Sequence, residues 1–370
     1  MFSNWFLKSF RILLFPFALV YGAIIWLRNQ LYNKKILPTT SFGLPIICVG
    51  NLAVGGTGKS PMVEYIVAHF KDKYKVATLS RGYKRKTKGY ALATDKTTSL
   101  DIGDEPMQFH LKFPEVPIAV GEKRLEAIPQ LLHDHPETQV IILDDAFQHR
   151  AIKAGLNILL TDYGNLFTRD FFLPTGDLRD MRTGYKRADI IVVTKCKPDI
   201  TLEEKLKITR EIKLLLKQEI FFTTIEYGVP YHIFKHNFTF IQEKTEVLLV
   251  TGIANPRPLK KFLEERIQSY HMMHFPDHHI FTIDDWQDMR DRFDSMDASE
   301  KIILTTEKDA MRLLKFREQI NGTPFYVMPI EHRFLFNEGQ HFNALVGKFI
   351  ENFKHQPDPE SPGYSGEAAA

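Results

Sequence analysis

Short apolar runs alternate with longer segments of helical periodicity through the first part of the chain. Most of these runs are continuously apolar and rich in β-branched residues, which is typical of strands buried on both faces of a parallel sheet. The segments between them repeat apolar residues at the spacing of an amphipathic helix. This alternation predicts a doubly wound α/β domain. The predicted strands are 45–49, 75–79, 116–120, 140–143, 158–160 and 190–194, and the predicted helices include 61–70, 104–112 and 124–132.

A second series of strands follows a break at residues 228–237, where Gly, Pro and His replace the periodic pattern. Its predicted strands are 247–250, 302–305 and 325–328. The end of the chain is rich in Pro, Gly, Ser and Glu, which is typical of a disordered tail. The expected units are an N-terminal helical segment at 1–38, a larger α/β domain at 39–232, a smaller α/β domain at 233–352 and a tail at 353–370.

The N-terminus carries a different pattern from the rest of the chain. Residues 12–27 read ILLFPFALVYGAIIWL and contain no charged side chain. As a helix this run would be about 24 Å long, short of the roughly 30 Å hydrocarbon core of a bilayer. Aromatic and basic residues flank it, as at an anionic membrane surface. We favour a helix embedded in a membrane or crossing it shallowly; a cleaved signal peptide, a buried core helix and a short single span are the alternatives.

Charge is distributed unevenly along the 370 residues. The formal net charge is +3, yet the first acidic residue, Glu64, comes only after six Lys and Arg residues. This balance excludes a uniformly basic nucleic-acid binder, and the basic start fits the expected membrane-associated helix. The chain has two cysteines, Cys48 and Cys196, which is typical of a reducing compartment rather than of a disulfide scaffold.

A phosphate-binding loop follows the first predicted strand. The sequence AVGGTGKS matches the Walker A pattern except that Ala replaces the first Gly, and it lies between a strand and a helix as the motif requires. Its glycines let backbone N–H groups face phosphate oxygens, Lys59 supplies positive charge, and Ser60 is an expected Mg²⁺ ligand. The predicted nucleotide-binding residues are Ala53, Val54, Gly55, Gly56, Thr57, Gly58, Lys59 and Ser60. We therefore expect a P-loop NTPase-type, mostly parallel sheet flanked by helices.

An acidic pair directly follows another apolar strand. Asp144 and Asp145, in the sequence VIILDDAFQHR, have the position of a Walker B carboxylate, which holds Mg²⁺ directly or through water. The sequence does not separate the two, and Gln148 is a further candidate for the metal shell. The stretch VVTKCKPD is similar to the guanine-reading Asn-Lys-x-Asp motif, but Thr194 replaces the Asn and Lys197 the Asp. ATP with Mg²⁺ is therefore expected rather than GTP.

Charged residues after other predicted strands are candidates for binding an acceptor. Arg81 and Tyr83 lie in the basic stretch SRGYKRKTKGY, which either binds phosphate or a lipid headgroup or is a solvated loop. Asp104 and Glu105 in GDEP lie at an expected helix start, where Asp104 is either an N-cap or the acceptor of a hydroxyl proton. Arg179 in LPTGDLRD is suited to neutralise transition-state charge or to bind the acceptor.

The densest group of histidines lies in the stretch HMMHFPDHH, which contains His271, His274, His278 and His279. A zinc site is one interpretation, but no cysteine joins the group and the spacing fits no closed site. The other interpretation is a base or orienting residue carried by the second domain, because histidine titrates near neutral pH.

Taken in order, these motifs resemble those of the tetraacyldisaccharide 4'-kinase family of the lipid A pathway. The matching stretches, between Val49 and Ala310, are VGNLAVGGTGKSP, LSRGYKR, GDEP, ILDDAFQHR, LPTGDLR, VTK, TGIANP, FPDHH and TTEKDA. The Walker A stretch is generic, whereas SRGYKR, GDEP, DDAFQHR and FPDHH are much more specific. The resemblance implies a catalytic Asp–His pair at Asp104 and His278, chosen over His279 because it directly follows the Asp of FPDHH.

The same resemblance implies an activity and further roles. Lys59 and Arg179 would assist catalysis, and Arg81, Tyr83 and Glu105 are the predicted acceptor-binding residues. Asp180 stands where the family commonly has Glu, which puts a metal role for that position in doubt.

The implied reaction transfers the γ-phosphate of ATP to the 4'-hydroxyl of a tetraacylated glucosamine disaccharide 1-phosphate, a lipid A precursor. It would occur at the cytoplasmic face of the bacterial inner membrane, on an anionic surface, with no nucleic acid and no obligate protein partner. The alternative is a membrane-tethered P-loop ATPase that switches a protein partner, which would leave GDEP and FPDHH without a function.

Overall fold

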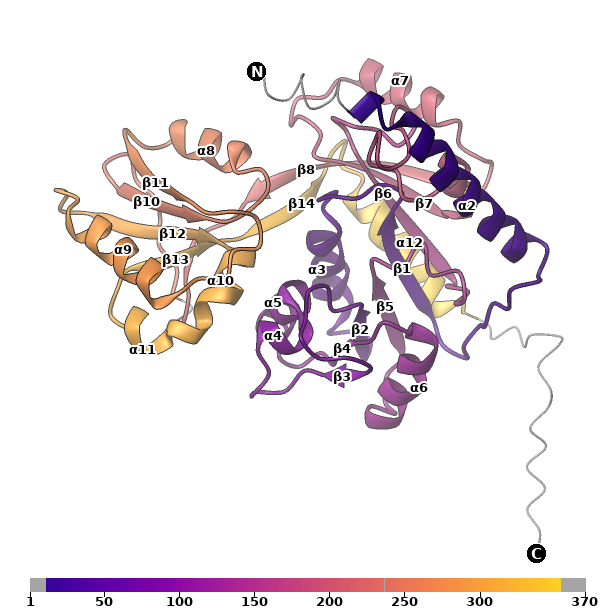
Figure 1. Cartoon of the computed structure of the whole chain (residues 1–370), viewed down its shortest axis with the longest axis horizontal. Coiled ribbons are helices and arrows are strands. Elements are labelled where there is room, and N and C mark those ends of the chain that lie inside the picture. Colours follow the sequence, from indigo (N-terminus) through magenta and orange to yellow (C-terminus); the bar gives the residue numbers. More distant parts are fainter. Residues whose placement is uncertain (1–10, 236, 354–370) are drawn as a thin grey trace, which may run out of the picture.

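Two sheets of different size form the molecule, and the computed structural model describes residues 11–235 and 237–353 (Figure 1). The larger sheet has nine strands, in the spatial order β14 (Ile330–Phe334), β8 (Glu219–Tyr227), β7 (Ile190–Thr194), β6 (Leu156–Asp162), β1 (Ile46–Asn51), β5 (Val140–Asp144), β2 (Val76–Ser80), β4 (Ile118–Val120) and β3 (Ala91–Leu92). The smaller sheet has five strands, in the order β11 (Tyr270–His274), β10 (Glu246–Thr251), β12 (Lys301–Thr306), β13 (Phe325–Met328) and β9 (Tyr231–His232).

The larger sheet is parallel except at its two edges, where β3 and β14 pair in the antiparallel sense. Its central strand β1 is buried along its whole length. Ile46 and Cys48 pack into the core on one face of the sheet, and Ile47 and Val49 into the core on the other. Burial on both faces explains why this strand reads as a continuous apolar run.

Helices cover both faces of the larger sheet. Those of this domain are α2 (Phe15–Asn33), α3 (Lys59–Phe70), α4 (Ser99–Ile102), α5 (Asp104–Lys112), α6 (Arg124–Asp134), the 3₁₀ helix η1 (Arg182–Arg187), α7 (Leu202–Ile212) and α12 (Gly339–Glu351). The apolar residues of α3 and α12 belong to one core, and those of α6 and α7 to the core on the opposite face. The expected P-loop NTPase-type architecture is confirmed.

The smaller sheet is likewise covered on both faces. Its helices are α8 (Arg257–Glu264), α9 (Ile283–Asp294), α10 (Glu307–Leu313), the 3₁₀ helix η2 (Leu314–Phe316) and α11 (Arg317–Ile320). Leu259 and Leu263 of α8 pack on one face, whereas α9, α10 and α11 pack on the other. The core under α10 also includes Ile102 and Met107 of the larger domain. The two domains therefore share apolar contacts beside α4 and α5.

The expected boundary of the smaller domain, 233–352, does not match the sheets and is corrected here. Strand β14 pairs with β8 at the edge of the larger sheet, from Ile330 opposite Tyr227 to Phe334 opposite Thr223. The following helix α12 packs into the same core as the P-loop helix α3. The chain thus leaves the larger domain after β8 and returns through β14. A local apolar pattern can predict a strand but not the strand with which it pairs. The sequence therefore did not predict that the chain returns to the larger sheet through β14.

Individual elements agree with the sequence pattern to different degrees. The strands Ile190–Thr194 and Phe325–Met328 and the helix Asp104–Lys112 have the predicted bounds. The strands β8, β11 and β14 were not predicted. Strand β11 has the sequence YHMMH, and none of its residues is fully buried. It therefore lacks the continuous apolar run by which other strands were predicted. The tail expected at 353–370 lies almost wholly outside the described residues.

The helix α2 lies on the surface of the larger domain and exposes much of its apolar side. Its buried residues are Ala18, Gly22 and Asn29, and a Cβ on Gly22 would come within 3.0 Å of Phe172. Its exposed apolar side chains are Phe15, Phe17, Leu19, Val20, Ile24, Trp26 and Leu27. The alternative of a buried core helix therefore does not describe α2. Within 11–235 and 237–353, no helix combines the length and apolarity that crossing a membrane requires.

Candidate active site

The P-loop connects the carboxyl end of β1 to the first turn of α3. Gly55 has a φ of 101° and Gly58 a φ of 84°, left-handed conformations that favour glycine. Lys59 and Ser60 begin α3. The backbone N–H groups of this first turn have no partner within the helix, so they are suited to bind phosphate oxygens. The strand–loop–helix arrangement is the one that the sequence predicts.

Neighbouring elements hold the loop in shape through Thr57 and Val54. The Asn51 side-chain amide donates to Thr57 Oγ1 at 3.0 Å, and the Thr194 hydroxyl donates to the Thr57 carbonyl at 2.8 Å. The Val54 N–H donates to the carbonyl of Asp177 at 2.7 Å. These bonds tie the loop to β1, to β7 and to the segment that carries Arg179. The phosphate cradle is therefore organised by its surroundings and not only by its glycines.

Two cations converge on Asp145 beside the loop. Arg179 donates two hydrogen bonds to the carboxylate, one of them at 3.0 Å, and another at 2.6 Å to Asn51 Oδ1. Lys59 Nζ lies 3.8 Å from Asp145 Oδ1. Burial alone would raise the pKa of Asp145, but Lys59 and Arg179 hold that pKa below its usual value. Burial lowers the pKa of Lys59. Asp145 thus holds both cations beside the loop.

Asp144 has a different environment from its neighbour. Its Oδ2 accepts a hydrogen bond from the Ser80 hydroxyl at 3.3 Å, whereas its buried Oδ1 has no hydrogen-bond partner among the described residues. Burial, and then the charge of Asp145, raise the pKa of Asp144 to about 6. A carboxylate oxygen without a hydrogen-bond partner and a serine hydroxyl such as that of Ser60 are hard oxygen donors of the kind that Mg²⁺ prefers. The two carboxylates, which sequence alone did not separate, therefore differ in their freedom to bind a metal.

The other two positions considered for the metal are tied into the fold. The Gln148 amide nitrogen donates to the Asn51 carbonyl at 2.6 Å, and its buried Oε1 has no partner within the described part of the chain. Asp180 accepts hydrogen bonds from Asn29 at 2.7 Å and from Arg187 at 2.8 Å. Gln148 thus keeps an oxygen available, whereas Asp180 joins α2 to the segment that carries Arg179.

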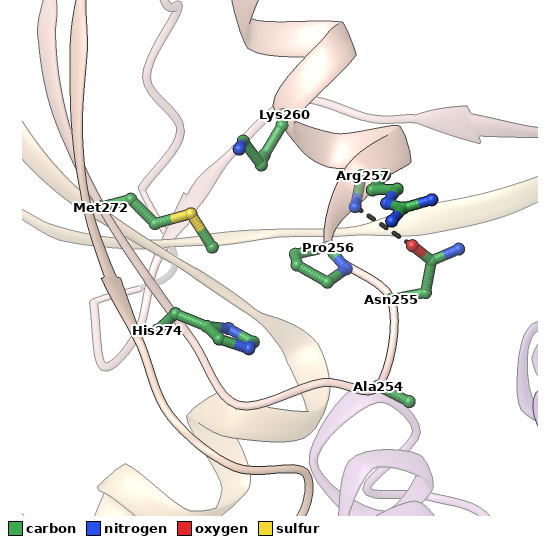
Figure 2. Close-up of a pocket in the computed structure, with 7 residues that line it drawn as sticks. All are labelled: Ala254, Asn255, Pro256, Arg257, Lys260, Met272 and His274. Atoms are coloured by element: carbon green, nitrogen blue, oxygen red, sulfur yellow. Dashed lines mark hydrogen bonds between the residues drawn. The ribbon is translucent and has the colours of Figure 1, made fainter. Parts of the chain in front are cut away.

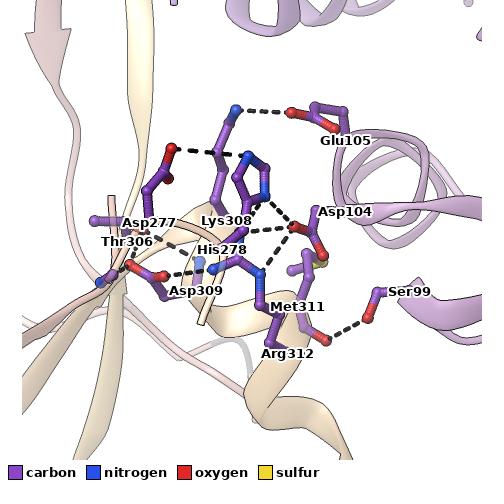
Figure 3. Close-up of polar contacts among 11 residues, drawn as sticks. Ser99, Asp104, Glu105, Asp277, His278, Thr306, Lys308, Asp309, Met311 and Arg312 are labelled. Atoms are coloured by element: carbon purple, nitrogen blue, oxygen red, sulfur yellow. Dashed lines mark hydrogen bonds and ion pairs between the residues drawn. The ribbon is translucent and has the colours of Figure 1, made fainter. Parts of the chain in front are cut away.

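A second polar group forms where the two domains meet (Figure 3). Asp104 begins α5 of the larger domain, and His278 follows β11 in the smaller domain, 174 positions further on. The two side chains approach to 3.4 Å between Asp104 Oδ2 and His278 Nδ1. Arg312 of α10 donates to the same Oδ2 at 2.9 and 2.7 Å and lies 3.2 Å from His278 Nδ1. The structure therefore brings together the Asp and His that the sequence paired.

The backbone around His278 is held in an uncommon conformation. Its φ is 63°, in the left-handed region that non-glycine residues rarely adopt. The His278 N–H donates to the Gly252 carbonyl at 3.2 Å, and the Gly252 N–H donates to Asp309 Oδ2 at 3.0 Å. Arg312 donates to the other oxygen of Asp309 at 3.2 Å. This chain of contacts fixes the His278 ring against Asp104.

Of the predicted acceptor-binding residues, Tyr83 contacts this pair. The Tyr83 ring meets the His278 ring edge-on, with centroids 5.9 Å apart, and Arg81 is exposed beside it in sequence. Glu105 instead pairs with Lys308 of the smaller domain at 2.7 Å. Its side chain therefore bridges the domains rather than lying open to an acceptor.

The P-loop group and the Asp104 group act on each other electrostatically. After burial and closer charges, Lys308 contributes to lowering the pKa of Lys59. After burial and Asp145, Glu105 contributes to raising the pKa of Asp144. Glu105 and Lys308, which lie beside the Asp–His pair, are therefore close enough to the P-loop group for their charges to act on Asp144 and Lys59.

Two of the other three histidines of the cluster, His271 and His279, have structural partners. His279 bonds with Asp285 at 2.9 Å and stacks on Phe275 with ring centroids 4.8 Å apart. His271 bonds with Glu246 at 3.0 Å. In residues 11–235 and 237–353 no group of three or more His, Cys, Asp or Glu side chains is arranged to hold a metal ion. The geometry favours His278 over His279 as the partner of Asp104.

A cavity of about 600 Å³ lies in the smaller domain, between α8 and the end of β11 (Figure 2). Its walls contain three basic side chains and none that is acidic. The lining residues are Ala254, Asn255, Pro256, Arg257, Lys260, Met272 and His274. It adjoins the stretch TGIANP, whose Gly252 holds the backbone of His278.

Sequence reasoning missed Arg312, Lys308 and His332. Lys308 lies within the motif TTEKDA, and Arg312 follows four positions later on the same face of α10. Helical periodicity starting from this motif could therefore have indicated both residues. His332 of β14 donates from Nε2 to the Gly58 carbonyl at 2.8 Å, and its Nδ1 accepts from the Thr223 hydroxyl at 2.9 Å. Burial lowers the pKa of His332 to about 4, so it stays neutral. The local sequence around His332 does not indicate this contact, because it forms only when β14 pairs with β8 at the edge of the larger sheet.

The fold and this site define a P-loop kinase, with a phosphate-binding loop in one domain and an Asp–His pair completed by the other. The family model described as tetraacyldisaccharide-1-P 4'-kinase matches residues 10–350. The chain belongs to this family, and it is a kinase.

Relatives that carry the name of this kinase, and a solved structure, agree with this assignment. The tetraacyldisaccharide 4'-kinases of Flavobacterium johnsoniae and Bacteroides thetaiotaomicron are 44% and 43% identical to the chain; each alignment covers 92% of it, and 97% and 94% of the relatives. A crystal structure of LpxK from Aquifex aeolicus in complex with ATP is similar with a TM-score of 0.73 at 28% identity, covering 92% of this chain and 99% of that one.

Proposed function

We propose that the protein phosphorylates the 4'-hydroxyl of a tetraacylated glucosamine disaccharide 1-phosphate with ATP, in lipid A biosynthesis. One observation carries this proposal beyond a generic ATPase. An Asp–His pair formed by two domains lies beside Glu105 and Lys308, whose charges act on the P-loop group at Asp144 and Lys59. Its use is to accept the proton of a hydroxyl group that becomes phosphorylated.

The chemistry follows from the positions of the side chains. Lys59 and the N–H groups at the start of α3 bind the phosphates. Arg179, which shares the Asp145 carboxylate with Lys59, adds a second positive charge beside them. The acceptor oxygen forms a bond to the γ-phosphorus, and the bond from that phosphorus to the β–γ bridging oxygen breaks. ADP leaves, and the hydroxyl proton passes to the Asp104–His278 pair. The cations stabilise negative charge that spreads over the phosphate oxygens.

A divalent cation fits the site. Asp144 Oδ1 and Ser60 would hold Mg²⁺, with Gln148 Oε1 as a further candidate oxygen. When bound, the ion would neutralise charge on the phosphates. Asp145 is engaged by Lys59 and Arg179, which favours Asp144 as the direct ligand.

The location of the acceptor explains the N-terminal helix. An acyl-chain-bearing sugar stays in a membrane, whereas ATP is dissolved in the cytoplasm. The exposed apolar side of α2 supports a docking surface on an anionic membrane, which in this proposal is the cytoplasmic face of the bacterial inner membrane. The link from Asn29 to Asp180 connects this surface to the segment that carries Arg179. The proposal needs no nucleic acid and no protein partner.

The test is transfer of label from [γ-³²P]ATP to purified tetraacyl disaccharide 1-phosphate in detergent micelles with Mg²⁺. We expect labelled lipid that depends on the acceptor, and almost none with Asp104→Asn, a variant that keeps the side-chain shape. Label released only as inorganic phosphate would overturn the proposal. A stimulation of that release by a protein partner would instead support the ATPase switch.

A further inference from the structure

A buried group of charges lies where the P-loop helix, α5 and the smaller domain meet, away from the reacting atoms. Lys112, the last residue of α5, pairs with Glu64 of α3 at 2.7 Å and with Glu307 at 3.2 Å. Glu307 is the first residue of α10, so one ammonium group joins the two domains. Both carboxylate side chains are no more than 4% exposed.

Further hydrogen bonds fix the two carboxylates. Gln108, one turn before Lys112, donates to Glu64 at 2.6 Å. The N–H of Ile330, which begins β14, donates to Glu307 at 3.2 Å. The group therefore touches the P-loop helix, α5, α10 and a strand by which the chain crosses between the domains.

From these contacts we infer that Lys112 is a positioning residue of the kinase, which sets the place of His278 and Arg312 relative to the ATP phosphates. The inference rests on the proposed function. Asp104 with Arg312 and Glu105 with Lys308 join α5 to α10 at the N-terminal end of α5. Lys112 lies eight positions along α5 from Asp104, about 12 Å at the rise of a helix, so it adds an attachment to α10 at the opposite end of α5.

The charges explain why an ion group suits this task better than apolar packing. A buried ion pair contributes little net stability compared with apolar residues, but its geometry is specific. Burial, and then the charge of Glu307, raise the pKa of Glu64 to about 8. Burial would lower the pKa of Lys112, but the two carboxylates hold it above its usual value. The raised pKa of Glu64 means that the protonated form of this carboxyl is favoured at neutral pH, beside the ammonium group of Lys112.

The test replaces Lys112 by Met, which keeps the length of the side chain and removes the charge. We expect kcat for lipid phosphorylation to fall about 10- to 100-fold, because small misplacements of reacting groups have effects of this size. The KM for ATP should stay within about threefold, since the P-loop is untouched. Lys112→Arg should restore most of kcat. The matched control is Lys123→Met, which removes an exposed ion pair within the larger domain and should leave kcat unchanged.

A second measurement reports the domain arrangement itself. Spin labels at cysteines introduced in place of Gln130 on α6 and Lys261 on α8, both exposed, give an interdomain distance distribution. The native cysteines Cys48 and Cys196 are buried and stay unlabelled. We expect the distribution to broaden in Lys112→Met and to return to the wild-type form in Lys112→Arg.

The outcomes separate this inference from the proposed function. If Lys112→Met does not fold, the double variant Glu307→Gln, Lys112→Met also removes the carboxylate that the single variant leaves without a cation, and it provides the same two measurements. A wild-type distance distribution, or a wild-type kcat despite a broadened one, would overturn the role of Lys112. A protein that phosphorylates no lipid would end the proposed function, while the distance measurement would still decide whether Lys112 orients the domains.

Discussion

The P-loop is formed by eight consecutive residues of one domain, whereas Asp104 and His278 come from different domains and are 174 positions apart. The loop is held by its own domain, through contacts such as those of Thr57 with Asn51 and Thr194. The Asp–His pair exists only while the domains are correctly oriented. The two halves of the site should therefore respond differently to mutation.

The largest expected effects distinguish phosphate binding from proton transfer. Lys59→Ala removes a buried cation from the phosphate site, so we expect a weaker Kd for ATP and a kcat/KM lower by about 10³-fold. Asp104→Asn should lower kcat by about 10²- to 10⁴-fold and leave the Kd for ATP within a few-fold. Calorimetric ATP titration and steady-state assays measure both. Equal loss of ATP affinity in the two variants would show that the halves are not separable.

A smaller effect separates the two adjacent histidines. His278→Ala removes the partner of Asp104, and we expect kcat to fall about 100-fold. His279→Ala removes a hydrogen bond to Asp285 and a stack on Phe275, so it should cost about 1 kcal/mol of stability and change kcat less than fivefold. Assays and urea denaturation of both variants test this, and the reverse ranking in kcat would assign the pair to His279.

The last expected effect concerns stability rather than activity: a pH dependence at the junction of the two regions. The pKa of Glu64 is raised from its usual range to about 8 by burial and by Glu307, so the folded state favours the protonated acid. Its contribution to stability is fully present below about pH 4.5 and is lost as the pH rises through 8. Glu64→Gln mimics the neutral acid, and its stability relative to the wild type should therefore increase between pH 5 and pH 9.

Denaturant unfolding at pH 5, 7 and 9 measures this difference, with Glu115→Gln as the control. Glu115 forms an ion pair with Lys71 at the surface of the same domain, and its pKa is lowered rather than raised. A constant difference between Glu64→Gln and the wild type across this range would contradict the raised pKa of Glu64 in the folded protein.

The same contrast explains what the sequence could predict. A contiguous motif carries its own local structure, so the P-loop and the helix Asp104–Lys112 follow from residue pattern alone. The approach of His278 to Asp104 was expected through resemblance to a family, because no periodicity relates two residues in different domains. Arg312 and His332 were missed for the same reason: their partners, Asp104 and Gly58, lie far away in sequence and depend on how the chain returns.

Strands β8 and β14 have a consequence for how the molecule is assembled from its parts. Tyr227 and Ile330 face each other in the ladder, so the chain leaves and re-enters the larger domain at neighbouring points. The smaller domain is in effect an insertion into a β-hairpin, and a short turn joining these two residues would close the hairpin without it. Two adjacent strands also resist twisting more than a single linker does. The two-stranded connection therefore allows the smaller domain to bend relative to the larger one, but it restricts rotation of the smaller domain about the strand direction.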